Sequence, residues 1–432
     1  MRVLCVDRAG DGLLDAAWRA QEAGHKVKFF LRDFDREKRP VGLGMIELVP
    51  DWRAWIRWAD IVLLSSNDIY MAEMDRYRAE GVPIIGGGVE SASWEHDRAK
   101  GMRVFRKAGI PVPPYREFTS YDDAIAYVRR KGIAFASKPC GNCDDKSLSY
   151  VAKGPADLLF MLERWRKQGK RQGIEFILQE KIDGIEMAVG AWFGPGGFAP
   201  GWEENFEFKR LMPGDVGPNT GEMGTVMRLV RRSKLAERVL VPLETQLDSI
   251  GFVGNVDVNC IIDDSGNPWP LEFTTRFGWP AWNIETALHD GDPIDFLAAV
   301  AVGDAIRRDA RKIDTIALGA YVRFLDGRGI IGAPVYGDLT SQHRAVELLG
   351  GKAPMEREQG IAERDCFCSA GDHPLIGVGT GGTVREAARA AYKAIREISI
   401  PGSPFWRVDI GARLKKQLPK LQEHGYASGM TY

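Results

Sequence analysis

The sequence is poor in the features that mark several special classes of protein. Six cysteines in 432 residues are too few for a disulfide framework. No run of about 18 apolar residues occurs, so we expect no transmembrane helix. The formal net charge is only −1, which favours neither nucleic acid nor a membrane as a partner. We therefore expect a soluble, cytoplasmic, multi-domain protein. We also expect that it acts on small molecules, as a monomer or a homodimer.

Motifs for several common chemistries are also missing or incomplete. The six histidines are scattered, and neither H-E-x-x-H nor G-x-S-x-G occurs, so nucleophilic hydrolysis has no support. Gly10-Asp11-Gly12 begins like a dinucleotide fingerprint, but Asp15 replaces the third glycine. That carboxylate would stand where a pyrophosphate binds, which disfavours a nicotinamide cofactor.

The cysteines leave one alternative open. Cys140 and Cys143 have the spacing of a metal knuckle or redox motif, and Cys366 and Cys368 could supply two more thiolates. The competing interpretation is that all four are reduced structural cysteines.

Strand and helix patterns alternate through the first hundred residues, which predicts an α/β fold with a parallel sheet. Helices are expected over residues 52–58 and 93–108, and a proline-rich linker over 110–114. Further on, Thr383 and Glu386 form a capping box that predicts a helix to residue 397.

Two lysines are candidates for binding phosphate. Lys138 ends an apolar strand, where a charge is costly unless it meets an anion. Lys100, on the preceding helix, could add a second contact, although a solvated helix face would explain it equally well. Beyond them, the strand edge near Gln179 offers backbone groups to an adenine, and Glu186 is spaced to accept from ribose hydroxyls.

Residues 254–274 form two apolar strands around a polar turn, which predicts a hairpin. Asp257 and Glu272 lie on its two strands and could face one another across the ladder. Such a carboxylate pair suits Mg²⁺, which takes the rest of its ligands from water and phosphates. Arg276 follows at once as a donor for developing phosphoryl charge, and a salt bridge to Glu272 is its structural alternative.

A long glycine loop, residues 211–224, follows the cations Lys209 and Arg210. Its backbone amides, with Asn219 and Thr220, could wrap a carboxylate or a phosphate.

These motifs resemble the phosphoribosylamine–glycine ligases of the ATP-grasp superfamily. The resemblance rests on Gly217-Pro218-Asn219-Thr220-Gly221-Glu222-Met223-Gly224, on Glu272-Phe273-Thr274-Thr275-Arg276-Phe277-Gly278, and on the late R-x-D-I-G motif at Arg407 to Gly411. It implies an N-terminal Rossmann-like domain (residues 1–100), two ATP-grasp subdomains (101–185 and 186–314) and a C-terminal α+β domain (315–432).

The resemblance also implies ATP, with Mg²⁺ or Mn²⁺, and an amide formed through an acyl phosphate. The implied ATP-binding residues are Lys100, Lys138, Lys146, Gln179, Lys181, Ile182 and Glu186. The implied metal ligands are Asp257, Glu272 and Thr274, the catalytic cations are Arg276, Lys209 and Arg210, and the substrate loop holds Asn219, Thr220 and Gly221.

The chain departs from the family mainly around the amine substrate. Thr274 replaces a metal-binding asparagine, and the acidic pair after R-F-G has become Trp279 and Ala281. Residues 9–13 and 65–70 replace the two loops that line the family's phosphoribosylamine site. We therefore consider the same chemistry on another amine or amino acid, and a non-catalytic nucleotide-binding protein, as alternatives.

Overall fold

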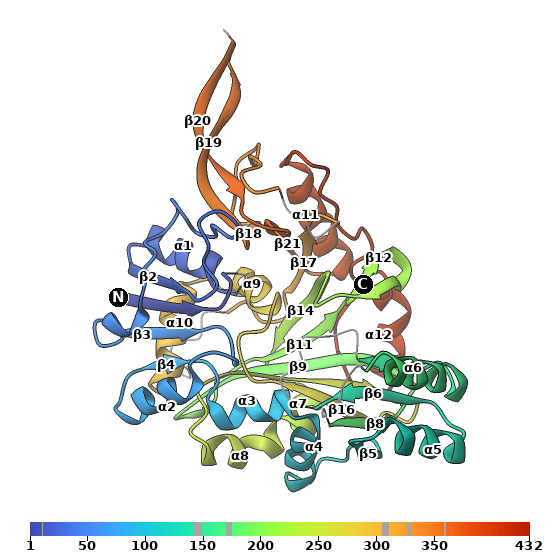
Figure 1. The fold of residues 1–432 in the computed structure, drawn as a ribbon. Coiled ribbons are helices and arrows are strands. Elements are labelled where there is room, and N and C mark those ends of the chain that lie inside the picture. Colours follow the sequence, from blue (N-terminus) through green and yellow to red (C-terminus); the bar gives the residue numbers. More distant parts are fainter. Residues whose placement is uncertain (11, 141–148, 170–174, 305–310, 326–329, 358–359) are drawn as a thin grey trace.

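A computed structural model of the chain describes residues 1–432 apart from 11, 141–148, 170–174, 305–310, 326–329 and 358–359. Within these residues, the strands form three sheets of four or more strands and two two-stranded ribbons (Figure 1).

The N-terminal sheet is parallel, as expected, with the order β2-β1-β3-β4. Its strands are short and almost wholly buried, which is typical of a parallel sheet covered on both faces. The strands are β1 (Arg2–Asp7), β2 (Lys26–Leu31), β3 (Ile61–Leu64) and β4 (Ile84–Ile85). The segments between them contain α1 (Leu14–Glu22), η1 (Trp52–Ala54) and α2 (Met71–Ala79).

Two expected helices differ in the structure. The helix expected over 52–58 is only the 3₁₀ turn η1, where Trp52 is buried against Tyr70 and Tyr77. The single helix expected over 93–108 is two helices, α3 (Val89–His96) and α4 (Arg98–Lys107). Asp97 separates them because its backbone is extended and its carboxylate caps α4 by accepting from the Lys100 amide.

The second sheet is antiparallel, with the order β5-β8-β6-β7. Its strands are β5 (Tyr115–Phe118), β6 (Phe135–Pro139), β7 (Tyr150–Val151) and β8 (Phe176–Glu180). The helices α5 (Tyr121–Lys131) and α6 (Pro155–Lys167) pack on it and share a core of their own with the strands.

The large sheet has the order β16-β15-β9-β11-β14-β17-β21-β18, with β10 paired to β9. Its strands are β9 (Ile185–Gly194), β10 (Gly197–Phe198), β11 (Trp202–Glu207), β14 (Gly224–Val230), β15 (Gly254–Ile262), β16 (Pro268–Thr274), β17 (Ile316–Val322), β18 (His343–Ala345) and β21 (Leu375–Gly381). Because β17 pairs with β14, the boundary expected at residue 314 falls inside one continuous sheet.

The remaining helices surround the large sheet, and α11 covers β17 and β21. They are α7 (Lys234–Val239), η4 (Val241–Leu243), α8 (Glu244–Ser249), α9 (Ala281–Glu285), η5 (Thr286–Leu288), α10 (Pro293–Ala301), α11 (Val384–Arg396) and α12 (Leu414–Glu423). The capping box predicted for α11 is confirmed, since Thr383 accepts from the Glu386 amide.

Two ribbons leave the body of the molecule. One is β12 (Arg210–Met212) and β13 (Val216–Asn219), joined through η3 (Pro213–Asp215). The other is β19 (Leu348–Arg357) and β20 (Gly360–Ser369), which projects as an arm (Figure 1). Among the described residues, no helix combines the length and the apolarity that crossing a membrane would need.

Candidate active site

One face of the large sheet is lined by polar side chains. Alternate residues of β11 are Glu203, Asn205 and Glu207, and the strand register places them on the same face as alternate residues of β9, β15 and β16. The neighbours on that face are Glu186, Asn255, Asp257, Asn259, Glu272 and Thr274.

The predicted hairpin is confirmed, but its expected pairing is wrong. Asp257 lies opposite Thr274, and Glu272 lies opposite Asn259. The register shifts between Asn259 and Cys260, which leaves Leu271 without a partner across the ladder. This bulge turns Glu272 and Thr274 onto the polar face, because a one-residue change of register exchanges the two faces of a strand.

The bulge also frees a backbone oxygen for Lys138. The Lys138 Nζ donates to the Leu271 carbonyl oxygen at 3.2 Å, which joins the second sheet to the large one. Burial lowers the pKa of Lys138 to about 8, although the nearby Glu272 carboxylate opposes this change. A partly buried lysine of this kind gains most from an anionic ligand.

Lys209 lies at the centre of a group of carboxylates. Its Nζ is 2.7 Å from Glu207 Oε2, 3.6 Å from Glu186 Oε1 and 3.6 Å from Glu272 Oε1. Burial alone would lower the pKa of Lys209, but the surrounding carboxylates raise it well above its usual value. The three carboxylates therefore already converge on one cation.

The helix α4 contributes Arg98 to this group of carboxylates, and not Lys100 as we expected. Arg98 Nη2 is 2.8 Å from Glu272 Oε2. Lys100 instead contacts Glu90 on α3, with Nζ 2.7 Å from Oε2, on the exposed side of the helices. Arg98, which the sequence analysis missed, is thus the α4 cation at the polar face.

The segment expected to bind adenine joins the second sheet to the large one. Gln179 is buried at the end of β8 and donates to the Met102 sulfur. Lys181, whose ammonium pairs with Asp183, and Ile182 follow in the short link to β9. Lys146, expected to contact ATP, lies outside the described residues.

Asp257 is held inside the protein rather than at the edge of the polar face. Its Oδ2 accepts from Asn205 Nδ2 at 2.7 Å, and burial raises its pKa to about 7. Gly190 lies beside it, and a Cβ there would approach Glu203 Oε2 to 2.7 Å and Asp257 Oδ2 to 3.0 Å. Asn259, which donates to Glu207 Oε2 at 3.1 Å, is the β15 residue directly across from Glu272.

The glycine loop begins and ends beside Lys209. Thr220 donates to the Lys209 carbonyl oxygen through both its amide and its hydroxyl, each at 2.8 Å. Asn219 and Gly221 are exposed beside it. Arg210 is also exposed and donates to the Gly217 carbonyl oxygen, so its guanidinium braces the loop rather than joining the carboxylates.

Arg276 lies on the other side of the hairpin, where it contacts the N-terminal unit. Its guanidinium is 3.1 Å from Glu95 Oε1 on α3. Glu95 Oε2 also accepts from the Thr275 amide and from Asn67 Nδ2, and Asn67 bonds to His96. Glu95 therefore orients Arg276, and the sequence analysis missed it.

The donor set fits Mg²⁺. Glu272 is about one-quarter exposed, and the amide side chain of Asn259 lies opposite it. Glu186 and Glu207 lie close by, because all three carboxylates contact Lys209. The described residues contain no cluster of three or more His, Cys, Asp or Glu arranged to hold a metal ion. Mg²⁺ does not require such a cage, because one or two carboxylates suffice when phosphates and waters supply the other ligands.

The missed residues leave a partial signal in the sequence. Asn205 and Glu207 alternate with Phe206 and Phe208 just before Lys209, a period of two that predicts one polar face, although Glu204 next to Glu203 interrupts it. No comparable pattern separates Arg98 from Lys100, since both follow the Asp97 cap.

Of the cysteines expected as possible metal ligands, Cys140 lies far from Cys366 and Cys368, whose sulfur atoms are 3.6 Å apart. Cys140 is buried against Ala99 and Ile177, and burial raises its pKa to about 11. Cys366 and Cys368 lie on the arm, at the opposite end of the molecule from β6 (Figure 1), and Cys143 is outside the described residues.

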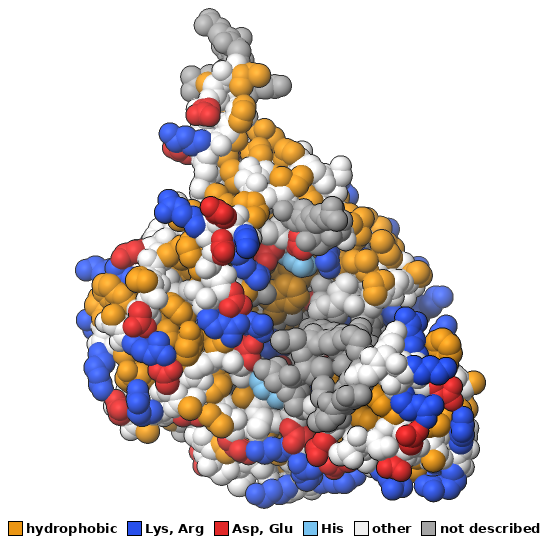
Figure 2. Space-filling model, viewed as in Figure 1, with side chains coloured by type: hydrophobic (Ala, Val, Ile, Leu, Met, Phe, Trp, Pro, Cys, Tyr) orange, Lys and Arg blue, Asp and Glu red, His pale blue; other side chains and the backbone are white. Residues whose placement is uncertain are grey.

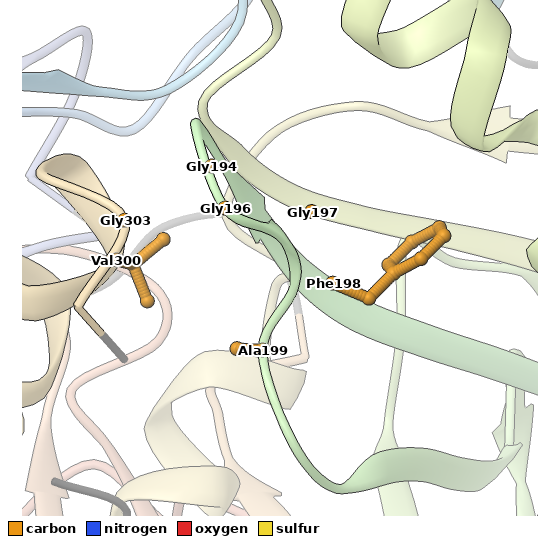
Figure 3. Close-up of a pocket in the computed structure, with 7 residues that line it drawn as sticks. All are labelled: Gly194, Gly196, Gly197, Phe198, Ala199, Val300 and Gly303. Atoms are coloured by element: carbon orange, nitrogen blue, oxygen red, sulfur yellow. The ribbon is translucent and has the colours of Figure 1, made fainter. Parts of the chain in front are cut away.

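Hollows on the surface differ in character. Figure 2 shows a hollow at the centre of one face, with hydrophobic side chains on its floor and charged side chains around it. Among the described residues, those that line the small pocket of Figure 3 are Gly194, Gly196, Gly197, Phe198, Ala199, Val300 and Gly303. None of these seven has a charged side chain, and the pocket is not part of the polar face.

Comparison with known proteins gives a consistent result. Residues 98–281 match the family model of the phosphoribosylglycinamide synthetase ATP-grasp (A) domain. Phosphoribosylamine–glycine ligase of Xylella fastidiosa is 26% identical over 364 residues, covering 82% of this chain and 81% of the relative. The enzyme of that name from Ralstonia nicotianae is 27% identical, covering 79% and 81%.

Solved structures show the same fold. Phosphoribosylamine–glycine ligase of Thermotoga maritima superposes with a TM-score of 0.73 at 17% identity, covering 95% of this chain and 100% of that one. Biotin carboxylase of Campylobacter jejuni gives a TM-score of 0.62 at 13% identity, covering 98% and 97%. The chain thus has the ATP-grasp fold and resembles phosphoribosylamine–glycine ligases, as its motifs predicted.

Proposed function

We propose that this chain is an ATP-dependent carboxylate–amine ligase that forms an amide and releases ADP and phosphate. The observation that carries the proposal is the convergence of Lys138, Lys209 and Arg98 with Glu186 and Glu272 where two sheets meet. The relatives named phosphoribosylamine–glycine ligase and the ATP-grasp fold support the same reaction type.

The nucleotide would lie between the second sheet and the large sheet. Gln179, Lys181 and Ile182 would contact the adenine, and Glu186 would accept from the ribose. Lys138 and Arg98 would contact the phosphates, to which Lys146 is proposed as a further contact. Lys100 points to Glu90 and does not join them.

Glu272, with Asn259 or Thr274 beside it, would hold Mg²⁺, which neutralises phosphate charge during transfer. The substrate carboxylate attacks the γ-phosphorus and yields an acyl phosphate and ADP. The amine then attacks the acyl carbon, phosphate leaves, and the amine loses a proton. Lys209 and Arg276 would offset the negative charge that develops, and Asn219, Thr220 and Gly221 would contact the carboxylate substrate.

No side-chain nucleophile is needed in this scheme, because positioning and charge neutralisation supply the catalysis. We further propose that the chain works in the cytoplasm as a monomer or homodimer. We also propose that the four domains expected from the sequence, with boundaries at residues 100, 185 and 314, act as distinct functional units.

The test is to trap the acyl phosphate without its natural amine. The protein is incubated with ATP, Mg²⁺, hydroxylamine and one amino acid at a time, and hydroxamate and ADP are measured together. Equal amounts of both with at least one amino acid would support the ligase. ATP binding by calorimetry with no hydroxamate from any carboxylate would instead favour a non-catalytic nucleotide-binding protein.

A further inference from the structure

The start of α1, in the N-terminal unit, is already occupied by the chain's own carboxylates. Asp7 is buried, and its two oxygens accept from the Ala9 amide at 3.2 Å and the Leu13 amide at 2.9 Å. Asp15, in the first turn, is also buried and accepts from the Ala345 amide. Asp15 also pairs with Arg19 and Arg344, which compensate its charge. The start of a helix ordinarily attracts a phosphate, but here the Asp7 carboxylate already takes the amides that a phosphate would use.

The arginines beside these residues are neutralised as well. Arg8 contacts both Asp33 and Asp68, and its Nη1 lies 2.5 Å from Asp68 Oδ2. Arg32 contacts Asp33 at 2.7 Å, and its hydrogen bond lowers the pKa of that carboxylate. Two guanidinium groups and two carboxylates leave no net positive charge to hold a phosphate dianion.

The loop at the end of β3 is packed tightly and offers a neutral group. A Cβ on Gly12 would approach the Ser65 Cβ to 2.8 Å, so little room remains between these two loops. The Ser65 hydroxyl is buried and has no hydrogen-bond partner among the residues that the structure describes. This site suits a neutral polar group better than an ionised one.

Beyond Arg276, an aromatic group takes the place of the acidic residue that the resemblance leads one to expect. The Trp279 ring lies 4.6 Å from the Tyr321 ring and 5.9 Å from the His373 ring. Trp279 is partly exposed, and within the described part of the chain its buried Nε1 has no acceptor. His373 is 3.7 Å from Glu347, which pairs with Arg39 of the N-terminal unit, so this aromatic group faces that unit.

One cation beside the aromatic group has no carboxylate within ion-pair distance among the residues that the structure describes. Arg323 follows β17, two residues after Tyr321, and its guanidinium donates to the Phe324 carbonyl oxygen at 3.4 Å and to the Met223 sulfur at 3.8 Å. Burial lowers the pKa of Arg323, and the charges of Asp372 and Glu347 nearby oppose this change. A half-buried guanidinium is best stabilised by a carboxylate, so the Arg323 side chain is suited to bind one carboxylate of a ligand.

We propose that the amine substrate is an amino acid with an aromatic or large apolar side chain, not a phosphorylated sugar amine. Its carboxylate would bind Arg323 and its side chain would lie on Trp279. The inference rests on the proposed ligase function and narrows it. In Figure 2 the hollow with a hydrophobic floor lies near the position of α9 in Figure 1, and α9 begins two residues after Trp279.

The test compares amine substrates in the full-length enzyme. ADP release is measured with ATP, Mg²⁺ and the carboxylate identified by hydroxamate trapping, while each of the twenty amino acids serves in turn as the amine. Glycine with freshly generated phosphoribosylamine is the rival pair. Release with an aromatic or large apolar amino acid, and none with phosphoribosylamine, is the expected result.

Three variants separate a binding role from a folding defect. Trp279→Asp should lower kcat/KM for the amino acid about tenfold, and Trp279→Phe should retain most of it. Arg323→Met should raise its KM by about tenfold or more. Hydroxamate formation needs no amine substrate and should stay unchanged in all three variants. Phe160→Asp, on the exposed face of α6, is the control, and neither hydroxamate formation nor amine-dependent ADP release should change in it.

Each other outcome is decisive. ADP release with phosphoribosylamine, and with no amino acid as the amine, would overturn the inference and leave the ligase function standing. Failure to form a hydroxamate from any carboxylate would overturn both. A loss of hydroxamate formation in Trp279→Asp and Arg323→Met equal to the loss of amide formation would show that these residues are merely structural.

Discussion

The guanidinium of Arg407, in the C-terminal segment, forms an ion pair with Asp215 in the glycine loop, and its Nη1 lies 3.0 Å from Oδ1. The same nitrogen donates to the Arg210 carbonyl oxygen at 2.9 Å, and Asp409 accepts both from Arg407 and from the Gly214 amide. Arg407 is completely buried. The late R-x-D-I-G motif therefore holds in place the loop that would contact the substrates, nearly two hundred residues earlier in the chain.

Arg407→Lys should loosen this loop, because an ammonium cannot reproduce the forked contacts of a guanidinium. We expect a loss of about 2 kcal/mol in the free energy of unfolding, measured by urea denaturation, since both carboxylate partners are partly exposed. Limited proteolysis should cut within residues 210–221 sooner than in the parent. Unchanged proteolysis of that loop would contradict its attachment through Arg407.

Arg98→Met should weaken ATP binding, whereas Lys100→Met on the same helix should not. Arg98 contacts Glu272, and Lys100 contacts Glu90 away from the polar face. We expect the ATP dissociation constant, measured by calorimetry, to rise about tenfold in the first variant. In the second it should change by less than about twofold, as is usual for an exposed ion pair. The reverse order would restore Lys100 as the phosphate contact.

Glu272→Gln should lower the rate of ADP formation about a hundredfold, because the amide cannot replace the carboxylate as a metal ligand. The measurement is ADP release at saturating ATP, repeated over a range of Mg²⁺ and Mn²⁺ concentrations. Glu163→Gln is the matched control, since Glu163 pairs with Arg129 on the outer helices. Full activity of Glu272→Gln at ordinary Mg²⁺ would remove Glu272 from the metal site.

ATP affinity should fall as the pH rises through the pKa of Lys138. Burial lowers that pKa to about 8, so the ammonium is present below this pH and is lost above it. Calorimetric titrations with ATP from about pH 7 to about pH 9.5 should show the loss, after correction for the nucleotide's own ionisation. Lys138→Arg should retain affinity across that range because a guanidinium stays charged. A flat profile in the parent protein would show that Lys138 does not bind phosphate.

The sequence by itself determined most of the local structure of this protein, because local structure depends on neighbouring residues. Buried strands alternating with helices predict the parallel N-terminal sheet, and the polar turn at residues 263–267 predicts the β15–β16 hairpin. The capping pair Thr383 and Glu386 predicts where α11 begins. Each of these signals depends on residues close together in the chain.

Only the tertiary structure decided which side chains meet. The bulge at Leu271 turns Glu272 and Thr274 onto the polar face, and the break at Asp97 directs Arg98, rather than Lys100, toward Glu272. The contacts of Arg276 with Glu95 and of Arg407 with Asp215 each span more than 180 positions. Such pairs depend on strand register and on how separate sheets pack together, and neither is encoded in the periodicity of a single segment.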